Sequence, residues 1–382
     1  MIYLDNNATT AVAPEVLEAM VPWLRDEYGN PSSVYESGRR ANAAIESARA
    51  SVAGLIGASP EEIIFTSCGT ESINTAILSC ASMDPDRRHV VTSAVEHSAT
   101  IKLCEHLARR GYEITWLPVR ADGTLDPDLV AESITDETAV VSLLLANNET
   151  GVLFPVEEIG RIATERKVPF HIDAVQAAGK VPVDVRACGA HFLSLSGHKL
   201  HCPKGVGALW VRNGLRYEPL LRGSQENGRR GGTQNVASIV AFGAAAALAA
   251  ERLEECGARV RAMRDLFESR VLSEVPGTTL NGHSAQRLPN TSNLSFEGIR
   301  SEEALLLLGE RGICVSAGSA CSSGSVHPSH VLRAMGVPNE LAGASLRFSF
   351  GRMNSDSEAV AAAEAVREVV GRLRERGPRT VR

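Results

Sequence analysis

The sequence predicts an α/β protein with a mostly parallel sheet in a large domain and a smaller α+β domain at its C-terminal end. Short apolar segments alternate with amphipathic helical segments over the first part of the chain, as in βαβ units. Several apolar segments are uninterrupted, which is typical of strands buried on both faces of a sheet. The alternation ends near Val236. We expect the large domain over residues 1–257 and the small domain over residues 258–382, with residues 1 to about 12 packed on the small domain.

The elements follow one another in a regular order along the chain. We expect the strands of the large domain at 61–67, 88–97, 112–119, 139–148, 168–176, 191–199 and 205–212. Helices between them include 70–80 and 155–167. A long helical stretch from about 236 to 275 leads into the small domain. That domain should contain strands in "GICVS" and "SLRFSF" and helices from Ser301 and Asp356.

Composition narrows the class of protein. The 382 residues are 44% hydrophobic and 22% charged, with a net charge of -6, which favours a large core and argues against nucleic acid as a partner. The N-terminal residues lack the basic and apolar regions of a secretory signal, and the longest apolar run is too short to span a membrane. The eight cysteines show no metal-ligand spacing. We therefore expect a cytoplasmic protein with reduced thiols and no intrinsic metal, and no association with a membrane.

Polar residues gather at the carboxyl ends of the predicted strands, where open α/β sheets bind their ligands. They are Gly69, Thr70, His97, Asn148, Asp173, Gln176, Ser196, His198 and Lys199. Of the five lysines, only Lys199 directly follows a strand-end Ser-Gly-His. A lysine at such a buried position loses hydration and becomes a usable amine nucleophile. The alternative is a loop lysine whose ammonium group lies in water.

Two further features suggest a cofactor. Asp173 ends an apolar strand and is followed one strand later by Lys199, and pyridoxal phosphate needs an aspartate at its ring nitrogen and a lysine at its aldehyde carbon. Alone, Asp173 is equally typical of a turn or a helix cap. Gly69 and Thr70 lie at a strand-to-helix turn, where backbone N–H groups bind phosphate, although a simple helix start explains them as well.

Cys321 lies in "GSACSSGS", a run of Gly, Ala and Ser that is poor at forming regular structure. A reactive thiol on such a loop can move between two sites. The alternative is a loop cysteine without a function. His327 and His330 follow it with a spacing that only weakly suggests a metal site. Cys314, in the preceding apolar segment, is expected to be a buried core thiol.

Motifs along nearly the whole chain resemble the cysteine desulfurases of the class V pyridoxal-phosphate aminotransferase superfamily. They include "YLDNNATT", "GNPSSVY", "FTSCGTES", "EHSAT", "NNETG", "HIDAVQAAGK", "SLSGHKLHCPKGVGAL", "GSACSSGSVHPSHVLRAMG" and "SLRFSFGR". "FTSCGTESINTAIL" and "LLRGSQENGRRGGTQN" are most similar to the nitrogen-fixation branch, of NifS type. The resemblance implies the pyridoxal-phosphate-dependent transferase fold, which is like that of aspartate aminotransferase.

The resemblance also implies a role for each site residue. Lys199 would carry the cofactor, Asp173 would pair with its ring nitrogen, His97 would stack on the ring and transfer protons, and Gln176 would contact the ring hydroxyl. Asn148 and Arg347 would bind the substrate carboxylate. The phosphate would be held by Gly69, Thr70, Ser196 and His198, and by Thr233 from the second subunit of a homodimer.

The implied reaction converts L-cysteine to L-alanine on pyridoxal phosphate and forms a persulfide on Cys321. The sulfur would pass to an iron–sulfur scaffold or another acceptor protein, for nitrogenase maturation, and Cys321 would be able to ligate a nascent cluster transiently. Three alternatives remain open: a housekeeping desulfurase, another class V aminotransferase or lyase, and a non-catalytic protein that binds the cofactor for structure. A tolerated change of Cys321 to alanine would favour the second of these.

Overall fold

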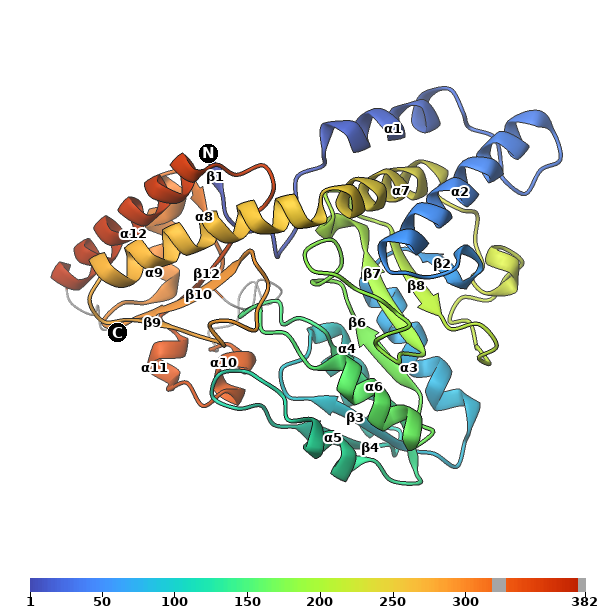
Figure 1. The fold of residues 1–382 in the computed structure, drawn as a ribbon, viewed down its shortest axis with the longest axis horizontal. Coiled ribbons are helices and arrows are strands. Elements are labelled where there is room, and N and C mark those ends of the chain that lie inside the picture. The colour runs from blue at the N-terminus through green and yellow to red at the C-terminus, as the bar shows by residue number, and fades with distance from the viewer. Residues whose placement is uncertain (318–327, 377–382) are drawn as a thin grey trace.

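The computed structural model describes residues 1–317 and 328–376, which form two lobes joined by a pair of long helices (Figure 1). The larger lobe is built on a seven-stranded sheet in the order β2-β8-β7-β6-β5-β3-β4. Its strands are β2 (Ile63–Thr66), β3 (His89–Ser93), β4 (Glu113–Leu117), β5 (Thr138–Leu144), β6 (Phe170–Asp173), β7 (Phe192–Ser196) and β8 (Gly207–Val211). All neighbours are parallel except the two pairs that involve β8. This confirms the predicted α/β fold class.

Successive residues of these strands pack on opposite faces of the sheet, which explains their uninterrupted apolar sequences. Phe192 belongs to one hydrophobic cluster and Leu193 to another. The face that carries Leu193 is covered by α1 (Pro14–Arg25), α2 (Glu36–Leu55), α5 (Pro127–Ser133), α6 (Val156–Glu165) and α7 (Val236–Glu251). The face that carries Phe192 is covered by α3 (Gly69–Met83) and α4 (Ser98–Ala108). The carboxyl ends of the parallel strands, and the N-termini of the helices that follow them, therefore lie at the same edge of the sheet.

The smaller lobe has its own hydrophobic cluster. Its antiparallel sheet has the order β12-β10-β9, with β9 (Thr278–Leu280), β10 (Thr291–Phe296) and β12 (Ser345–Ser349). Its helices are α8 (Leu253–Glu274), α9 (Ser301–Glu310), α10 (His330–Ala334), α11 (Asn339–Ala342) and α12 (Asp356–Arg376). Phe267 of α8 packs on Phe348 and Phe350, with ring centroids 4.5 and 5.6 Å apart.

The N-terminal segment runs from the smaller lobe to the sheet of the larger one. β1 (Ile2–Tyr3) pairs in parallel with β11 (Ile313–Cys314), and Leu4 is buried in the core of the smaller lobe. Thr10 then donates hydrogen bonds to the carbonyl oxygen of His198 through both its backbone N–H and its hydroxyl. Residues 5–9 therefore cross the junction between the lobes, beside the carboxyl end of β7.

The long helical stretch expected from 236 to 275 is two helices. α7 and α8 meet at a bend of 76°, where Arg252 leaves the helical region with φ -108° and ψ 13°. The bend has a packing cause, since α7 buries Phe242 in the large core and α8 buries Phe267 in the small one. A domain boundary between residues 257 and 258 would fall inside α8, and it stays a prediction.

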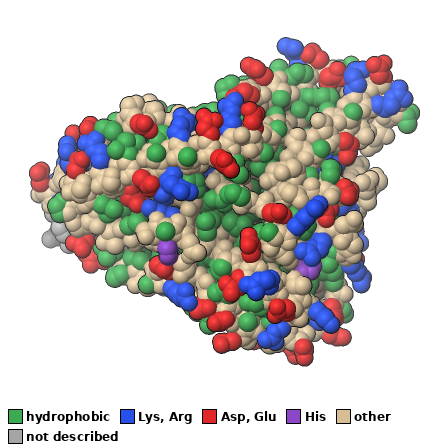
Figure 2. Space-filling model, in the orientation of Figure 1, with side chains coloured by type: hydrophobic (Ala, Val, Ile, Leu, Met, Phe, Trp, Pro, Cys, Tyr) green, Lys and Arg blue, Asp and Glu red, His purple; other side chains and the backbone are tan. Residues whose placement is uncertain are grey.

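In the part of the chain that the structure describes, three short 3-10 helices complete the secondary structure: Pro60–Glu62, Gly197–Lys199 and Glu226–Gly228. Within the described ranges, no single helix has the length and apolar character needed to cross a membrane. The α7–α8 pair meets those two criteria only when both helices are taken together across their bend. On the face shown in Figure 2, basic and acidic side chains are interspersed over both lobes.

Candidate active site

A cavity of about 520 Å³ lies at the carboxyl ends of the strands, facing the small domain. Its volume is within the range of cofactor and substrate pockets. It brings together ten of the residues singled out from the sequence: Gly69, Thr70, His97, Asn148, Asp173, Gln176, Ser196, His198, Lys199 and Arg347. Thr233 is exposed and does not line this cavity, and Cys321 lies outside the described residues.

One end of the cavity is formed by the start of α3. Gly69 is the first residue of this helix, so unpaired backbone N–H groups and the helix dipole favour an anion there. A Cβ atom at Gly69 would come within 3.0 Å of Val175 Cγ2 and 3.3 Å of Ser196 Cβ. A larger residue would therefore fill the space beside the Ser196 hydroxyl that a phosphate needs.

His198 lines the same part of the cavity as an uncharged imidazole. Burial and the nearby charge of Lys199 lower the pKa of His198 to about 4. Its Nδ1 lies 3.2 Å from the hydroxyl of Thr9 in the N-terminal segment. His198 can therefore contribute a hydrogen bond to a bound anion, but not a charge.

Asp173 ends β6 inside the cavity. Its Oδ1 accepts a hydrogen bond from the backbone N–H of Val175 at 2.9 Å. Burial raises the pKa of Asp173, while the nearby His97 ring, the hydrogen bond from Val175 and the positive charge of Lys199 lower it. A buried carboxylate in a cavity is stabilised by a cation beside it, so this position suits a protonated ring nitrogen.

His97 caps the N-terminus of α4 through its ring. Its Nδ1 accepts a hydrogen bond from the backbone N–H of Ala99 at 3.2 Å. With Nδ1 as the acceptor, the neutral ring carries its proton on Nε2. The capping bond holds the ring at the wall of the cavity, next to Asp173.

Lys199 lies in a 3-10 turn directly after β7. Its Nζ donates hydrogen bonds to the carbonyl oxygens of Asn7 and Ala8, both at 2.6 Å. The N-terminal segment therefore holds the amine that sequence analysis selected as the attachment point of the cofactor.

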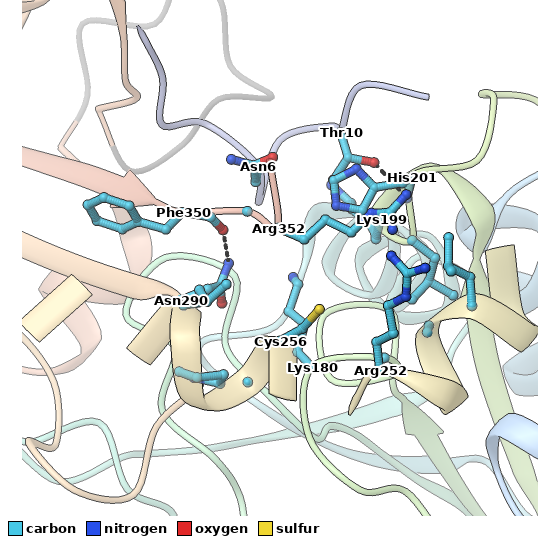
Figure 3. Close-up of a pocket in the computed structure, with 18 of the residues that line it drawn as sticks. Asn6, Thr10, Lys180, Lys199, His201, Arg252, Cys256, Asn290, Phe350 and Arg352 are labelled. Carbon is cyan, nitrogen blue, oxygen red and sulfur yellow. Dashed lines mark hydrogen bonds between the residues drawn. The ribbon is translucent and has the colours of Figure 1, made fainter. Parts of the chain in front are cut away.

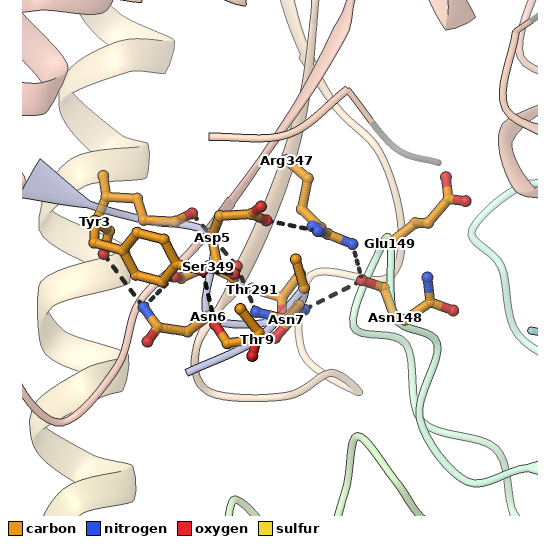
Figure 4. A network of polar contacts seen from close by, with 12 residues as sticks. Tyr3, Asp5, Asn6, Asn7, Thr9, Asn148, Glu149, Thr291, Arg347 and Ser349 are labelled. Atoms are coloured by element: carbon orange, nitrogen blue, oxygen red, sulfur yellow. Dashed lines mark hydrogen bonds and ion pairs between the residues drawn. The ribbon is translucent and has the colours of Figure 1, made fainter. Parts of the chain in front are cut away.

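Arg347, on β12, brings the small domain to the cavity and is almost fully buried (Figure 4). Its Nη1 donates to the carbonyl oxygen of Asn148 at 2.9 Å, and its Nη2 donates to Asp5 Oδ1 at 2.7 Å. Its Nε has no hydrogen-bond partner among the residues the structure describes. Because Arg347 lines the cavity, its guanidinium group is placed to bind a substrate carboxylate.

The turn that presents Asn148 is built by its neighbour Asn147. The Oδ1 of Asn147 accepts hydrogen bonds from the backbone N–H groups of Glu149 and Thr150, at 2.9 and 3.0 Å. Its Nδ2 donates to the carbonyl oxygen of Val95 at 3.0 Å. The "NNETG" motif therefore joins the ends of β5 and β3 in a fixed loop.

Several residues that organise the site were not predicted from the sequence, and Asn7 is the main one (Figure 4). Asn7 Nδ2 donates to the carbonyl oxygen of Asn148 at 3.2 Å and to the hydroxyl of Thr291 at 2.8 Å. Its carbonyl oxygen accepts from Lys199 and from Gln176. The "YLDNNATT" motif was the available signal, but the strand-end argument could not place residues that precede the sheet.

Glu96 and Glu149 are two further buried carboxyl groups at the cavity that were missed. Burial raises the pKa of Glu96 to about 8, despite hydrogen bonds from the Ser93 hydroxyl and the Leu144 N–H. Glu149 accepts a hydrogen bond from the hydroxyl of Ser329, and His330 Nε2 lies 3.0 Å from the Glu96 carbonyl oxygen. The chain is thus anchored to the cavity at residues 329 and 330.

The cysteines in the described ranges differ in exposure, and the expectation for Cys314 is wrong. Cys314 is partly exposed, because β11 is only two residues long and turns Ile313, not Cys314, into the core. Burial raises the pKa of Cys104 to about 12 and that of Cys188 to about 11. Among the residues described, no group of three or more metal-ligating side chains is found.

Comparisons with known proteins agree with this geometry. Residues 2–361 match the model of the family described as "Aminotransferase class-V". The chain is 49% identical over 379 residues to "Cysteine desulfurase NifS" of Azotobacter vinelandii, covering 99% of this chain and 94% of the relative. It is 47% identical over 382 residues to "Cysteine desulfurase IscS" of Methanosarcina thermophila, again covering 99% and 94%. A solved structure titled "NIFS-LIKE PROTEIN" matches with a TM-score of 0.91 at 36% identity, covering 97% of this chain and 99% of that one.

Proposed function

Because the chain belongs to the class V aminotransferase family and has the activity of a cysteine desulfurase, we propose that it takes sulfur from L-cysteine in the cavity described above and carries it as a persulfide on Cys321. The observation that carries this proposal is the meeting of Lys199, Asp173 and Arg347 in one cavity. An amine, a buried carboxylate and a guanidinium group are the groups that a cofactor and an amino-acid substrate would need together.

The enzyme depends on pyridoxal phosphate, and the residues present fit it. The start of α3 with Ser196 and His198 would hold the phosphate, and Asp173 would keep the ring nitrogen protonated. The space left by the missing side chain of Gly69 supports this placement. When bound, the cofactor withdraws electrons from the substrate and so weakens the bonds at its Cα atom.

The protein's own groups would orient the substrate and move its protons. Arg347 and Asn148 would bind the α-carboxylate of L-cysteine, and the amine of Lys199 would take the Cα proton. His97 carries its ring proton on Nε2 at the cavity wall, where it can donate a hydrogen bond or a proton. The thiolate of Cys321 would then attack the substrate sulfur, so that an S–S bond forms and the Cβ–S bond breaks. The electron pair of that bond would stay on Cβ, which takes up a proton, and alanine would leave.

The decisive experiment measures products from L-cysteine without any added 2-oxo acid. Purified protein with pyridoxal phosphate and a thiol reductant should release alanine and sulfide in equal amounts over many turnovers. An aminotransferase would stop without an amino-group acceptor, and a protein that binds the cofactor only for structure would release neither product. Either result would overturn the proposed activity.

We propose in addition that the enzyme works as a homodimer with shared active sites. Thr233 is exposed on the loop before α7 and lies outside its own chain's cavity, as expected if it reaches the phosphate of a second subunit. Large hydrophobic side chains are also exposed on the neighbouring loops and helix: Leu24, Tyr28, Val34, Tyr35, Leu220 and Leu221. A second copy of the chain would cover them.

The acceptor is proposed to be an iron–sulfur scaffold or another sulfur-carrying protein in the cytoplasm. Transfer of sulfur from a persulfide needs an acceptor thiol and a compartment in which thiols stay reduced. We favour a role in nitrogenase maturation because of the "FTSCGTESINTAIL" and "LLRGSQENGRRGGTQN" motifs. Similar identity to relatives called NifS and IscS leaves a housekeeping role as the second candidate.

A further inference from the structure

Lys180 is a second lysine at the active site, which the strand-end argument did not select. It lines a smaller cavity of about 80 Å³ that it shares with Lys199, at the junction between the two lobes (Figure 3). The turn after β6 brings it there, because Gly179 adopts a left-handed conformation with φ 70°. A Cβ atom at Gly179 would come within 2.2 Å of Leu200 Cδ2, so the turn requires glycine at this position.

The amine of Lys180 is hydrogen-bonded to two side-chain amides. Its Nζ donates to Gln176 Oε1 at 2.8 Å and to Asn7 Oδ1 at 3.3 Å. Gln176 Nε2 in turn donates to the carbonyl oxygen of Asn7 at 2.9 Å. Gln176 is buried and lines the main cavity, so its amide is held from both sides on the wall that faces the cofactor.

These contacts permit only one orientation of the Gln176 amide. Rotating the amide by 180° would place its NH₂ group against Lys180 Nζ and its oxygen against the carbonyl oxygen of Asn7. Both contacts would be repulsive, because a lysine amine with a proton to donate needs an acceptor and a carbonyl oxygen needs a donor. In the observed orientation the amide has one N–H left over that no contact with Lys180 or Asn7 uses.

We infer that Lys180 is a positioning residue that locks the Gln176 amide so that its remaining N–H is presented to the anionic ring oxygen of pyridoxal phosphate. The inference rests on the proposed function, in which Gln176 contacts that oxygen. It adds a second lysine whose task is to hold a hydrogen-bond donor, whereas Lys199 carries the cofactor.

The electrostatics around Lys180 suit this task. Its acceptors are uncharged amide oxygens, and burial together with the charges of Lys199 and Arg347 lowers the pKa of Lys180 well below its ordinary value. The positive charge of Lys180 in turn lowers the pKa of His198 and of His201. The amine therefore loses its proton more readily than an ordinary lysine. When uncharged it can still donate to Gln176, and the Asn7 carbonyl oxygen, which can only accept, continues to select the same orientation of the amide.

The test is the pH dependence of the visible absorbance band of the bound cofactor, recorded without substrate. Lys180→Met removes the donor at similar side-chain length, and exposed Lys204→Met is the matched control. Without a fixed N–H donor the ring oxygen becomes more basic, so the pH midpoint of the band should rise in Lys180→Met and stay unchanged in Lys204→Met. The affinity of the apoprotein for the cofactor should fall about tenfold.

Two further variants decide whether Lys180 acts through Gln176. Gln176→Glu keeps an acceptor for Lys180 but removes the donor, so it should show the same rise in midpoint even if Lys180→Met folds poorly. In a Gln176→Ala background, Lys180→Met should have no additional effect on the midpoint. An unchanged midpoint in Gln176→Glu, or an equal effect of Lys180→Met with and without Gln176, would overturn the inference. Both readouts are independent of turnover, so they do not depend on whether alanine and sulfide are released.

Discussion

At the scale of a residue, the buried carboxylate of Asp173 lowers the stability of the cofactor-free protein and is useful for catalysis. Burial raises its pKa, so in the cofactor-free protein its charged form is disfavoured relative to the unfolded chain. An acid whose pKa is raised on folding costs stability as the pH rises from the unfolded pKa through the folded one. The same carboxylate is the partner that a protonated ring nitrogen needs.

Asp173→Asn should therefore separate stability from activity. We expect the cofactor-free variant to be at least as stable as the wild type at pH 7, because no buried charge has to be desolvated. Activity should fall on the order of a hundredfold or more, since the amide cannot hold the proton on the ring nitrogen. Urea unfolding and alanine production measure the two effects, and a variant with wild-type turnover would contradict the assignment.

Glu96 predicts a specific pH dependence of stability. Its pKa is raised by burial to about 8, so the protein should lose stability from this group as the pH rises from about 4.5 to about 8. Glu96→Gln removes this loss, and its advantage over the wild type should grow by up to about 1.4 kcal/mol per pH unit in that window. Urea unfolding of cofactor-free protein at several pH values tests this. Exposed Glu61→Gln is the control, and a constant offset for Glu96→Gln would contradict the prediction.

Much of the site was predictable residue by residue, and the exceptions share one cause. Strand-end position led to Lys199 and Asp173 because both directly follow apolar strands. Asn7 and Lys180 do not, since one precedes the sheet and the other follows a glycine turn. Their roles come from contacts between segments 141 or more residues apart, as between Asn7 and Asn148, or from an i to i+4 contact outside a helix.

At the scale of elements, the start of α10 attaches the small domain to the cavity. Ser329 caps α10 by accepting from the Leu332 N–H at 3.2 Å, and its hydroxyl donates to buried Glu149. His330 contacts the Glu96 carbonyl oxygen. These contacts hold Ser329 and His330 at the cavity wall.

Ser329→Ala should slow sulfur transfer without changing cofactor binding. The variant loses a helix cap and leaves Glu149 without this donor, at a cost of about 1 kcal/mol in stability. We expect persulfide formation on Cys321 to slow on the order of tenfold, because small shifts in position strongly affect reaction rates. Rapid quenching with mass spectrometry measures it. Exposed Ser273→Ala is the control, and equal rates in both variants would sink the prediction.

Element order was easier to predict than element direction or continuity. The strands were located correctly because strands buried on both faces are uniformly apolar. That same uniformity hides direction, so the antiparallel β8 could not be distinguished from its parallel neighbours. The bend at Arg252 was missed because helical sequence continues through it, and only packing on two separate cores requires the break.

At the scale of the whole molecule, the proposed sharing of active sites between subunits predicts complementation between inactive subunits. Lys199→Ala and Thr233→Val should each be inactive or strongly impaired as pure homodimers. A mixed dimer would contain one site with both changes and one unchanged site, because Thr233 comes from the opposite subunit. Purified mixed dimers should therefore regain about half of wild-type activity. No recovery, or full activity of a monomer, would contradict the shared site.

The central claim is that the cavity residues bind and activate L-cysteine and that Cys321 takes the sulfur from it. The most direct measurement is alanine and sulfide production from L-cysteine by wild type and Cys321→Ala, with absorbance recorded and persulfides located by mass spectrometry. We predict that Cys321→Ala still binds the cofactor and still changes its absorbance with L-cysteine, because the cavity residues remain. It should release neither product, and only the wild type should carry a persulfide, at Cys321. Wild-type alanine production by the variant, or a persulfide found only on another cysteine, would contradict the account.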